Sequence, residues 1–209
     1  MYSAIAPGVY QGDKLEREIK QSLGGRQQRI LPMSRCMKLY QKAVFDGNEK
    51  YYDYRIRFGE DSNMTYPAML NSTRIVVMKD ALYYHYRYVE SSMTHNYDQG
   101  IYDSLQRVRT CMMRAALDKG VPDAKQAVNR EYCYMLLFVM KNELRNPSAG
   151  YRKRIREIFG SKENQERIRS TPLSVSGKLD KLLYQAARHP GGVLIPLLRM
   201  VFRLYDRKN

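Results

Sequence analysis

Residues 58–78, FGEDSNMTYPAMLNSTRIVVM, contain the two kinds of element that decide the fold. The motif Gly59-Glu60-Asp61 opens the stretch, and Ser62 after it is suited to cap a helix that runs to about Asn71. The run from Arg74 to Met78 is rich in β-branched residues and bounded by polar ones, which predicts a strand. This stretch therefore predicts a fold that combines helices and strands.

Upstream and downstream segments extend the same pattern to about residue 97. Asp13 with Glu16 is typical of a capping box, and the helix after it has apolar residues on one face as far as Leu23. A second helix is predicted from Ser34 to Phe45. The segment 46–57 alternates enough to predict an extended chain, and the Tyr-rich segment 81–89 predicts another strand.

Beyond residue 97 the pattern becomes helical throughout. Apolar residues from Ile101 to Ala116 recur at helical spacing, and Gly120 ends that helix. The run Tyr132 to Met140 is apolar on every side, so we expect it to be buried. Helices are also predicted at 176–188 and at the end of the chain. The expected organisation is an α/β segment at 1–97 and a basic helical tail at 98–209, with mostly α content overall.

The charge favours an anionic partner. Lys and Arg number 36 against 21 Asp and Glu, which gives a net charge of +15. Nucleic acid, an acidic membrane surface, a phosphorylated lipid and a nucleotide pyrophosphate are all compatible with this excess. Three widely spaced cysteines without a CxxC motif favour a reducing, cytoplasmic location, and no apolar run reaches the roughly 20 residues that span a bilayer.

Glu60 and Asp61 are the residues best suited to chemistry. Two adjacent carboxylates at the start of a helix are held in the ionised form by the free backbone N–H groups there. An ionised carboxylate in a cleft can take a proton from an attacking hydroxyl group. Acidic residues at helix starts are also ordinary caps, so the pair alone leaves both interpretations open.

The surroundings of the pair resemble a known family. The order of motifs along the chain is similar to the second half of family 2 glycosyltransferases, which have the GT-A fold. A lysine-containing helix precedes the acidic pair in that family, and a helix, a strand and a tyrosine-rich strand with a nearby serine follow it. The resemblance covers roughly residues 5 to 97. The matching segments are 37–42 (MKLYQK), 59–61 (GED), 74–77 (RIVV), 82–87 (LYYHYR) and 91–95 (SSMTH).

The resemblance implies an inverting sugar transfer from a nucleotide sugar to a lipid-linked or cell-surface polysaccharide acceptor. It gives Asp61 the role of catalytic base and places Glu60 beside it as an acceptor-binding or orienting carboxylate. Arg87 lies where a guanidinium group would meet the departing pyrophosphate. The substrate-binding candidates that the resemblance implies are Lys38, Arg87, Ser92 and His95.

One departure from the family pattern concerns the sugar donor. The family carries its nucleotide-binding strands and a metal-binding Asp-x-Asp motif in the first half of the domain. The printed sequence contains no Asp-x-Asp, so it offers no metal-ligand candidate for the manganese or magnesium ion that the resemblance implies. We expect the chain to lack the donor-binding half and to be inactive alone. It would then be a truncated product, or would need that half supplied in trans.

The basic tail permits two interpretations. Arg199 and Arg203 lie four residues apart among large apolar residues, which is the pattern of a helix in a membrane interface. A core helix would show a similar pattern. In the first case we expect a peripheral protein at the anionic inner face of the cell membrane.

Two further functions remain open. A non-catalytic scaffold or partner subunit would retain only the acceptor side of the cleft. A nucleic-acid-binding helical protein would carry basic and aromatic residues on one face. The tyrosines cluster at 83–88 whereas the basic residues cluster at 152–169, so nucleic acid is the least favoured partner.

Overall fold

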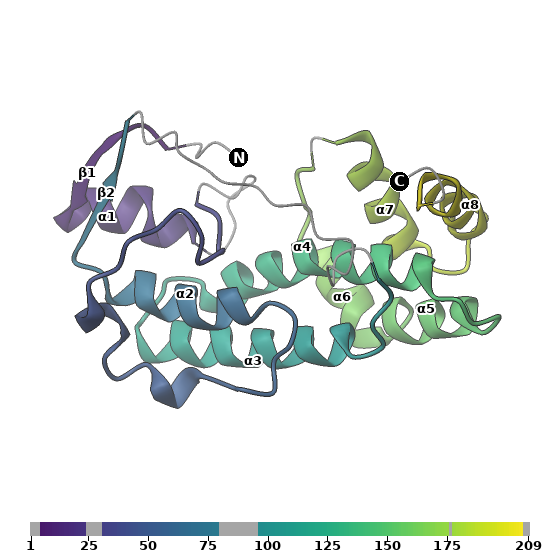
Figure 1. The fold of residues 1–209 in the computed structure, drawn as a ribbon, viewed down its shortest axis with the longest axis horizontal. Coiled ribbons are helices and arrows are strands. Elements are labelled where there is room, and N and C mark those ends of the chain that lie inside the picture. Colours follow the sequence, from purple (N-terminus) through teal and green to yellow (C-terminus); the bar gives the residue numbers. More distant parts are fainter. Residues whose placement is uncertain (1–4, 24–30, 80–95, 176, 207–209) are drawn as a thin grey trace. The chain divides into compact units, whose positions relative to one another are not determined.

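The computed structural model describes residues 5–23, 31–79, 96–175 and 177–206 (Figure 1). These residues are mostly helical and include one small antiparallel sheet, so the predicted predominance of helix is confirmed. The parallel sheet of a GT-A domain is not present in this described part. Two compact units are formed: unit 1 contains the described residues up to 79 together with 103–131, and unit 2 contains 96–102 and 132–206.

The sheet of unit 1 joins two segments that are far apart in the sequence. β1 (Gly8–Gln11) pairs antiparallel with β2 (Arg74–Val77), with Val9 opposite Val76. The strand predicted at 74–78 is therefore confirmed, and its described partner is the N-terminal strand. The other strand predicted there, 81–89, lies outside the described residues.

α1 (Gly12–Glu18) follows β1 directly and packs against the β1–β2 ribbon. Its predicted apolar face is confirmed, because Leu15, Ile19 and Leu23 are all buried. The predicted capping box is wrong. The helix begins before Asp13, at Gly12, and its N-cap Gln11 makes no side-chain hydrogen bond. Asp13 therefore lies inside the first turn.

α2 (Glu60–Asn71) confirms the predicted helix but begins earlier than expected. Gly59 is its N-cap and has φ = 82°, a left-handed conformation that glycine adopts at no steric cost. Ser62, the expected cap, is instead buried in the first turn. Most of the helix is buried, and Tyr66 is completely enclosed.

The helix predicted from Ser34 to Phe45 is wrong except at its end, where Lys42–Phe45 (η2) forms a 3₁₀ turn. Met37 has φ = 58°, and a non-glycine residue in this left-handed region interrupts an α-helix. Leu39, expected on the buried side, is fully exposed. The extended chain predicted at 46–57 is also wrong, since the segment contains the 3₁₀ turn Glu49–Tyr51 (η3) and no strand.

Asp53 anchors this irregular segment. Its carboxylate accepts hydrogen bonds from Arg55, at 2.8 Å from Nε and from Nη2, and from Arg107 Nη1 at 3.2 Å. Arg107 belongs to α3 (Ile101–Asp118). The hydrogen bonds from Arg55, with a further contribution from Arg107, hold the pKa of the Asp53 carboxyl well below its usual range. The polar anchor explains why the segment leaves the extended conformation.

Replacing Asp53 with Asn is expected to lower the free energy of unfolding by about 1–2 kcal/mol at pH 7, because charge-assisted hydrogen bonds are lost and Arg55 is largely exposed. A depressed carboxyl pKa stabilises the fold above the unfolded-state value of about 4, and this stability is lost as the pH falls through the folded-state pKa. The difference between wild type and variant should therefore shrink below pH 4. Urea titrations at pH 7, 5 and 3 measure this difference in the free energy of unfolding. Asp46→Asn, at an exposed position, is the control. A difference between wild type and Asp53→Asn that grows toward low pH would contradict the expectation.

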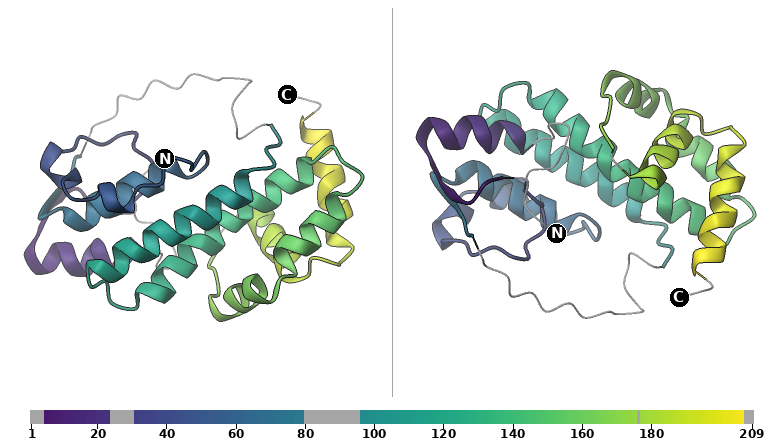
Figure 2. Two further views of the ribbon diagram at one scale, coloured as in Figure 1. Left: turned by 90° about the horizontal axis from the view of Figure 1, so that it is seen from below. Right: turned by 90° about the horizontal axis from the view of Figure 1, so that it is seen from above.

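α3 and the first part of α4 (Ala124–Arg145) complete unit 1. The chain reverses between them at Gly120 and Asp123, which both have positive φ. Within this unit, Arg109 Nε of α3 donates to Asn129 Oδ1 of α4 at 3.1 Å, and Figure 2 shows these parts of the two helices side by side. The apolar face predicted for 101–116 is confirmed by the burial of its members Ile101, Leu105, Val108, Met112 and Ala116.

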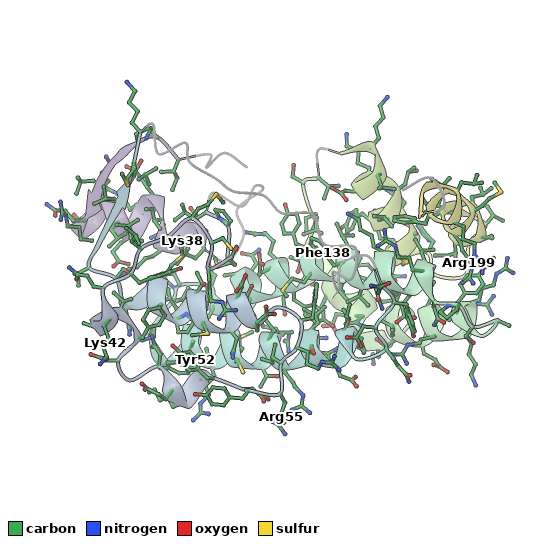
Figure 3. The ribbon with its side chains drawn as sticks, viewed as in Figure 1. Lys38, Lys42, Tyr52, Arg55, Phe138 and Arg199 are labelled. Carbon is green, nitrogen blue, oxygen red and sulfur yellow. The ribbon has the colours of Figure 1, made fainter. Side chains whose placement is uncertain are left out.

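Unit 2 is helical, as predicted for the tail. After α4 come α5 (Tyr151–Phe159), α6 (Lys162–Ser170), α7 (Lys178–Arg188) and α8 (Leu194–Asp206). Their core includes the fully buried side chains of Leu136, Leu144, Ile155, Phe159 and Ile168. The expected burial of residues 132–140 is confirmed except at Tyr134, which is half-buried, and at Phe138, which is exposed (Figure 3). Among the described helices, none combines the length and the apolar character needed to cross a membrane.

A buried carboxylate organises one end of unit 2. The side chain of Glu143 on α4 is only 1% exposed and accepts a hydrogen bond from Arg154 Nε of α5 at 3.1 Å. Asn146 Nδ2 donates to the same carboxylate at 3.2 Å. Arg154 Nη2 also donates to the carbonyl oxygen of Gln99 at 2.8 Å. This network joins α4, α5 and the segment before α3.

Candidate functional site

The acidic pair lies at the start of a helix, as the sequence predicts, but within the first turn of α2 and not before its cap. Gly59 turns the chain so that Glu60 and Asp61 are the first two residues of the helix. The side chains are 43% and 32% exposed respectively, so both are accessible to a ligand from solvent. Unpaired backbone N–H groups at this end of the helix stabilise negative charge there. The site is therefore built around two solvent-accessible carboxylates.

Arg35 faces the pair from a segment 26 residues earlier in the chain. Its Nε forms an ion pair with Asp61 Oδ1, and its Nη2 lies 3.9 Å from Glu60 Oε1. Nη1 is 3.6 Å from the sulfur atom of Met64, one turn further along α2. The hydrogen bond that Arg35 donates to Asp61 raises the pKa of Arg35, and the guanidinium group stays charged at every relevant pH. Arg35 thus holds one carboxylate of the pair in a defined orientation.

Lys38 lies on the same segment (Figure 3). Its Nζ donates to the carbonyl oxygen of Ser34 at 2.6 Å and, more weakly, to that of Cys36 at 3.5 Å. Burial lowers the pKa of the Lys38 ammonium group, while the negative charge of Asp61 acts in the opposite direction. Lys38 therefore stabilises the loop that contains it, through hydrogen bonds to backbone carbonyl groups, and adds positive charge near Asp61.

Tyr40 completes the group around the carboxylates. Its ring contacts that of Phe45, with the centroids 5.2 Å apart. Burial raises the pKa of the Tyr40 hydroxyl, and the negative charge of Asp61 acts in the same direction. The tyrosine therefore stays protonated near neutral pH and can act only as a hydrogen-bond donor or acceptor beside the acidic pair.

The structure thus brings together three of the predicted site residues, Glu60, Asp61 and Lys38. The remaining three, Arg87, Ser92 and His95, lie outside the described residues. The sequence did not identify Arg35, because a helix from Ser34 to Phe45 would have made it one more solvent-facing arginine. The signal that could have identified Arg35 is its position, since it places a second positively charged side chain three residues before Lys38.

A divalent cation does not fit the described part of this site. Among the described residues no group of three or more His, Cys, Asp or Glu side chains gathers in a metal-binding arrangement. Magnesium and manganese prefer several oxygen ligands, whereas Asp61 is already paired with Arg35 and a second cation, Lys38, lies close by. The chemistry available here is that of carboxylates positioned by cations.

Comparison of the chain with protein-family models gives no match. Comparisons with curated proteins and with solved structures give no significant match either.

Proposed function

We propose that this chain supplies the acceptor side of an inverting glycosyltransferase of family 2, with the GT-A fold as its parent architecture. The donor is a nucleotide sugar, and the acceptor is a hydroxyl group of a lipid-linked or cell-surface polysaccharide. The donor-binding half, with its divalent cation, is contributed by other residues than those of the printed chain. The proposal rests on the order of motifs in residues 5–97 and on the geometry around α2. The segment 37–42 departs from the family pattern, because it is not an α-helix in this chain.

The observation that carries the proposal is the pairing of Arg35 with Asp61. In the order of motifs that carries the resemblance, the lysine-containing segment 37–42 precedes the motif 59–61. The ion pair brings Arg35, two residues before that segment, to Asp61 across 26 residues of sequence. Accessible carboxylates at the start of a helix are suited to meet an acceptor hydroxyl group.

The chemistry requires one base on the acceptor side. Asp61 accepts the proton of the acceptor hydroxyl group, and the oxygen forms a bond to the anomeric carbon as the bond to the nucleoside diphosphate breaks. This single displacement inverts the anomeric configuration. Arg35 orients the carboxylate so that one oxygen faces the acceptor, and Glu60 holds a second hydroxyl group. Lys38 keeps the surroundings of the base positive.

One observation favours a second candidate, a non-catalytic subunit that binds the acceptor. Asp61 Oδ1 is occupied by Arg35. A carboxylate whose proton-accepting oxygen stays occupied would bind a sugar hydroxyl group without deprotonating it. The two candidates differ in one measurable respect, because only the first makes product formation depend on the Asp61 carboxylate.

The first test is enzymatic. The genomic sequence preceding the codon for Met1 is read, and any adjacent frame that carries an Asp-x-Asp motif is expressed together with this chain. The mixture is incubated with UDP-, GDP- and dTDP-sugars and a membrane glycolipid extract. Nucleoside diphosphate release and a product of inverted anomeric configuration are expected only when both parts are present.

Each outcome has a defined meaning. A product with retained configuration would refute a mechanism with a single base. Acceptor binding by the chain, measured with the same glycolipid extract, but no transfer with any donor, would favour the non-catalytic subunit. Tight DNA or RNA binding at 150 mM salt with a steep salt dependence would refute both.

A further inference from the structure

An open hollow of about 440 Å³ lies on the surface of unit 2, between the start of α5 and one flank of α8. It is lined by Tyr151, Pro196, Arg199, Met200, Arg203 and Leu204. Two of these six side chains are guanidinium groups and none is acidic. The lining is therefore suited to an anion with apolar surface beside it.

Arg199, on α8, is one of the residues that line the hollow (Figure 3). It is only 7% exposed, and its guanidinium carbon lies 3.6 Å from the centre of the Tyr151 ring. The Nη1 atom is buried and has no hydrogen-bond partner. An arginine keeps its charge at all relevant pH values, and a buried donor without a partner is costly. The side chain is thus held in place by stacking while one of its donors is unused.

Arg203 adds a second positive charge to the same flank. It follows Arg199 by four residues in a helix, so the two lie one above the other. Burial, and then the charge of Arg203, lower the pKa of Arg199. Among the residues whose side chains the structure describes, which end at Leu204, no acidic side chain forms an ion pair with either arginine. A bound anion would relieve the repulsion between the two guanidinium groups.

The neighbouring face of α8 is apolar and exposed. Leu197, Met200, Val201 and Leu204 are each more than half exposed, at 52–56%. Their spacing of three and four residues places them in one stripe, while Ile195, Leu198 and Phe202 are buried on the other side of the helix. Arg203 lies between the buried face and this stripe. An apolar stripe with basic residues along one edge is typical of a helix that lies in a lipid interface.

We propose that the hollow binds the phosphate group of an anionic phospholipid while the apolar stripe of α8 lies in the membrane interface. Arg199 and Arg203 contact the phosphate oxygens, and Tyr151 holds Arg199 in position. The stripe distinguishes a lipid from a free phosphate, since a free phosphate would leave Leu197, Val201 and Leu204 in water. The site contains none of the residues around α2. A failure of the lipid-binding proposal would therefore leave the proposed sugar transfer unaffected, and the reverse also holds.

A second copy of this chain fits the same face less well. Two copies related by a twofold axis would bring the same surface patch together, with arginines from both copies at one contact. This like-charge contact is unfavourable, whereas a surface of lipid phosphates is complementary to the arginines.

The proposal is tested by sedimentation with vesicles at 100 mM salt. The chain is expected to bind vesicles that contain 30% phosphatidylglycerol, and to bind pure phosphatidylcholine vesicles at least 10-fold more weakly. Arg199→Gln with Arg203→Gln should weaken binding to the anionic vesicles about 30-fold. Leu197→Ser with Val201→Ser, at exposed positions, should weaken it at least 10-fold. Circular dichroism confirms that each variant is folded.

The matched control is Arg169→Gln with Arg188→Gln, which removes the same charge from exposed positions on α6 and α7. It should change binding less than threefold, and an equal loss in control and test variants would overturn the proposal in favour of general charge attraction. The proposal that the bound phosphate belongs to a lipid would be overturned by two results together. The Leu197/Val201 variant would bind vesicles as wild type does, and 10 mM inorganic phosphate would abolish binding. Light scattering that finds a wild-type dimer and a monomeric Leu197/Val201 variant would assign the stripe to a second copy.

Discussion

Replacing Asp61 with Asn is expected to lower the turnover of an enzyme that contains this chain by about 10²- to 10⁴-fold, the usual contribution of a positioned general base. The amide keeps the size of the side chain and can still accept a hydrogen bond from Arg35, but it cannot take up a proton at neutral pH. The fold should be almost unaffected, because Arg35 and Asp61 are 51% and 32% exposed and an exposed ion pair contributes at most about 1 kcal/mol. Nucleoside diphosphate release at saturating substrate measures the effect.

Two variants control this experiment. Asp46→Asn removes an exposed carboxylate from the same unit and should leave turnover unchanged. Glu60→Gln should raise KM for the acceptor more than it lowers kcat, since Glu60 is proposed to hold the acceptor. Turnover by Asp61→Asn within threefold of wild type would rule out the base assignment and leave the non-catalytic subunit as the better proposal.

Replacing Arg154 with Met is expected to lower the free energy of unfolding of unit 2 by about 3 kcal/mol, because removing one partner of a buried ion pair leaves the other charge uncompensated. Glu143 is almost fully enclosed, and its other hydrogen-bond partners, which include Asn142, Asn146 and Tyr97, are uncharged groups. The lost hydrogen bond to the Gln99 carbonyl oxygen adds to the effect. Urea denaturation followed by circular dichroism measures the change.

The double variant Glu143→Met with Arg154→Met separates the buried charge from the loss of packing. It removes both partners, so it should be less destabilised than Arg154→Met alone. Arg156→Met, on the exposed side of α5, should change stability by less than about 0.5 kcal/mol. A double variant that is less stable than Arg154→Met would show that the pair acts mainly through its side-chain packing.

Local patterns in the sequence predicted several elements correctly. The burial of Leu15 and Ile19 on α1, and of Leu105 and Val108 on α3, follows from helical periodicity. The strand at β2 follows from its β-branched residues. Periodicity depends only on neighbouring residues, so it can be recognised without knowledge of the rest of the fold.

The errors arose where local preference gave way to a longer-range constraint. Residues 34–45 have a helical apolar pattern, but the left-handed Met37 interrupts it and Arg35 turns to Asp61. Residues 46–57 alternate like a strand, yet Asp53 binds Arg107 of α3 and the segment takes an irregular course. Both segments are held by ion pairs to residues distant in sequence, which no local window includes.

The sequence by itself determined that a helix follows Gly59 closely, that the later part of the chain is helical, and that Arg199 and Arg203 share one helix face. Only the tertiary structure decided that Arg35 is the partner of Asp61 and that β1 is the described partner of β2. It also decided that Arg199 is buried against Tyr151 with an unused donor. Helix periodicity and glycine conformation are properties of a few adjacent residues, whereas the partner of a charge or of a strand is chosen by the packing of the whole unit.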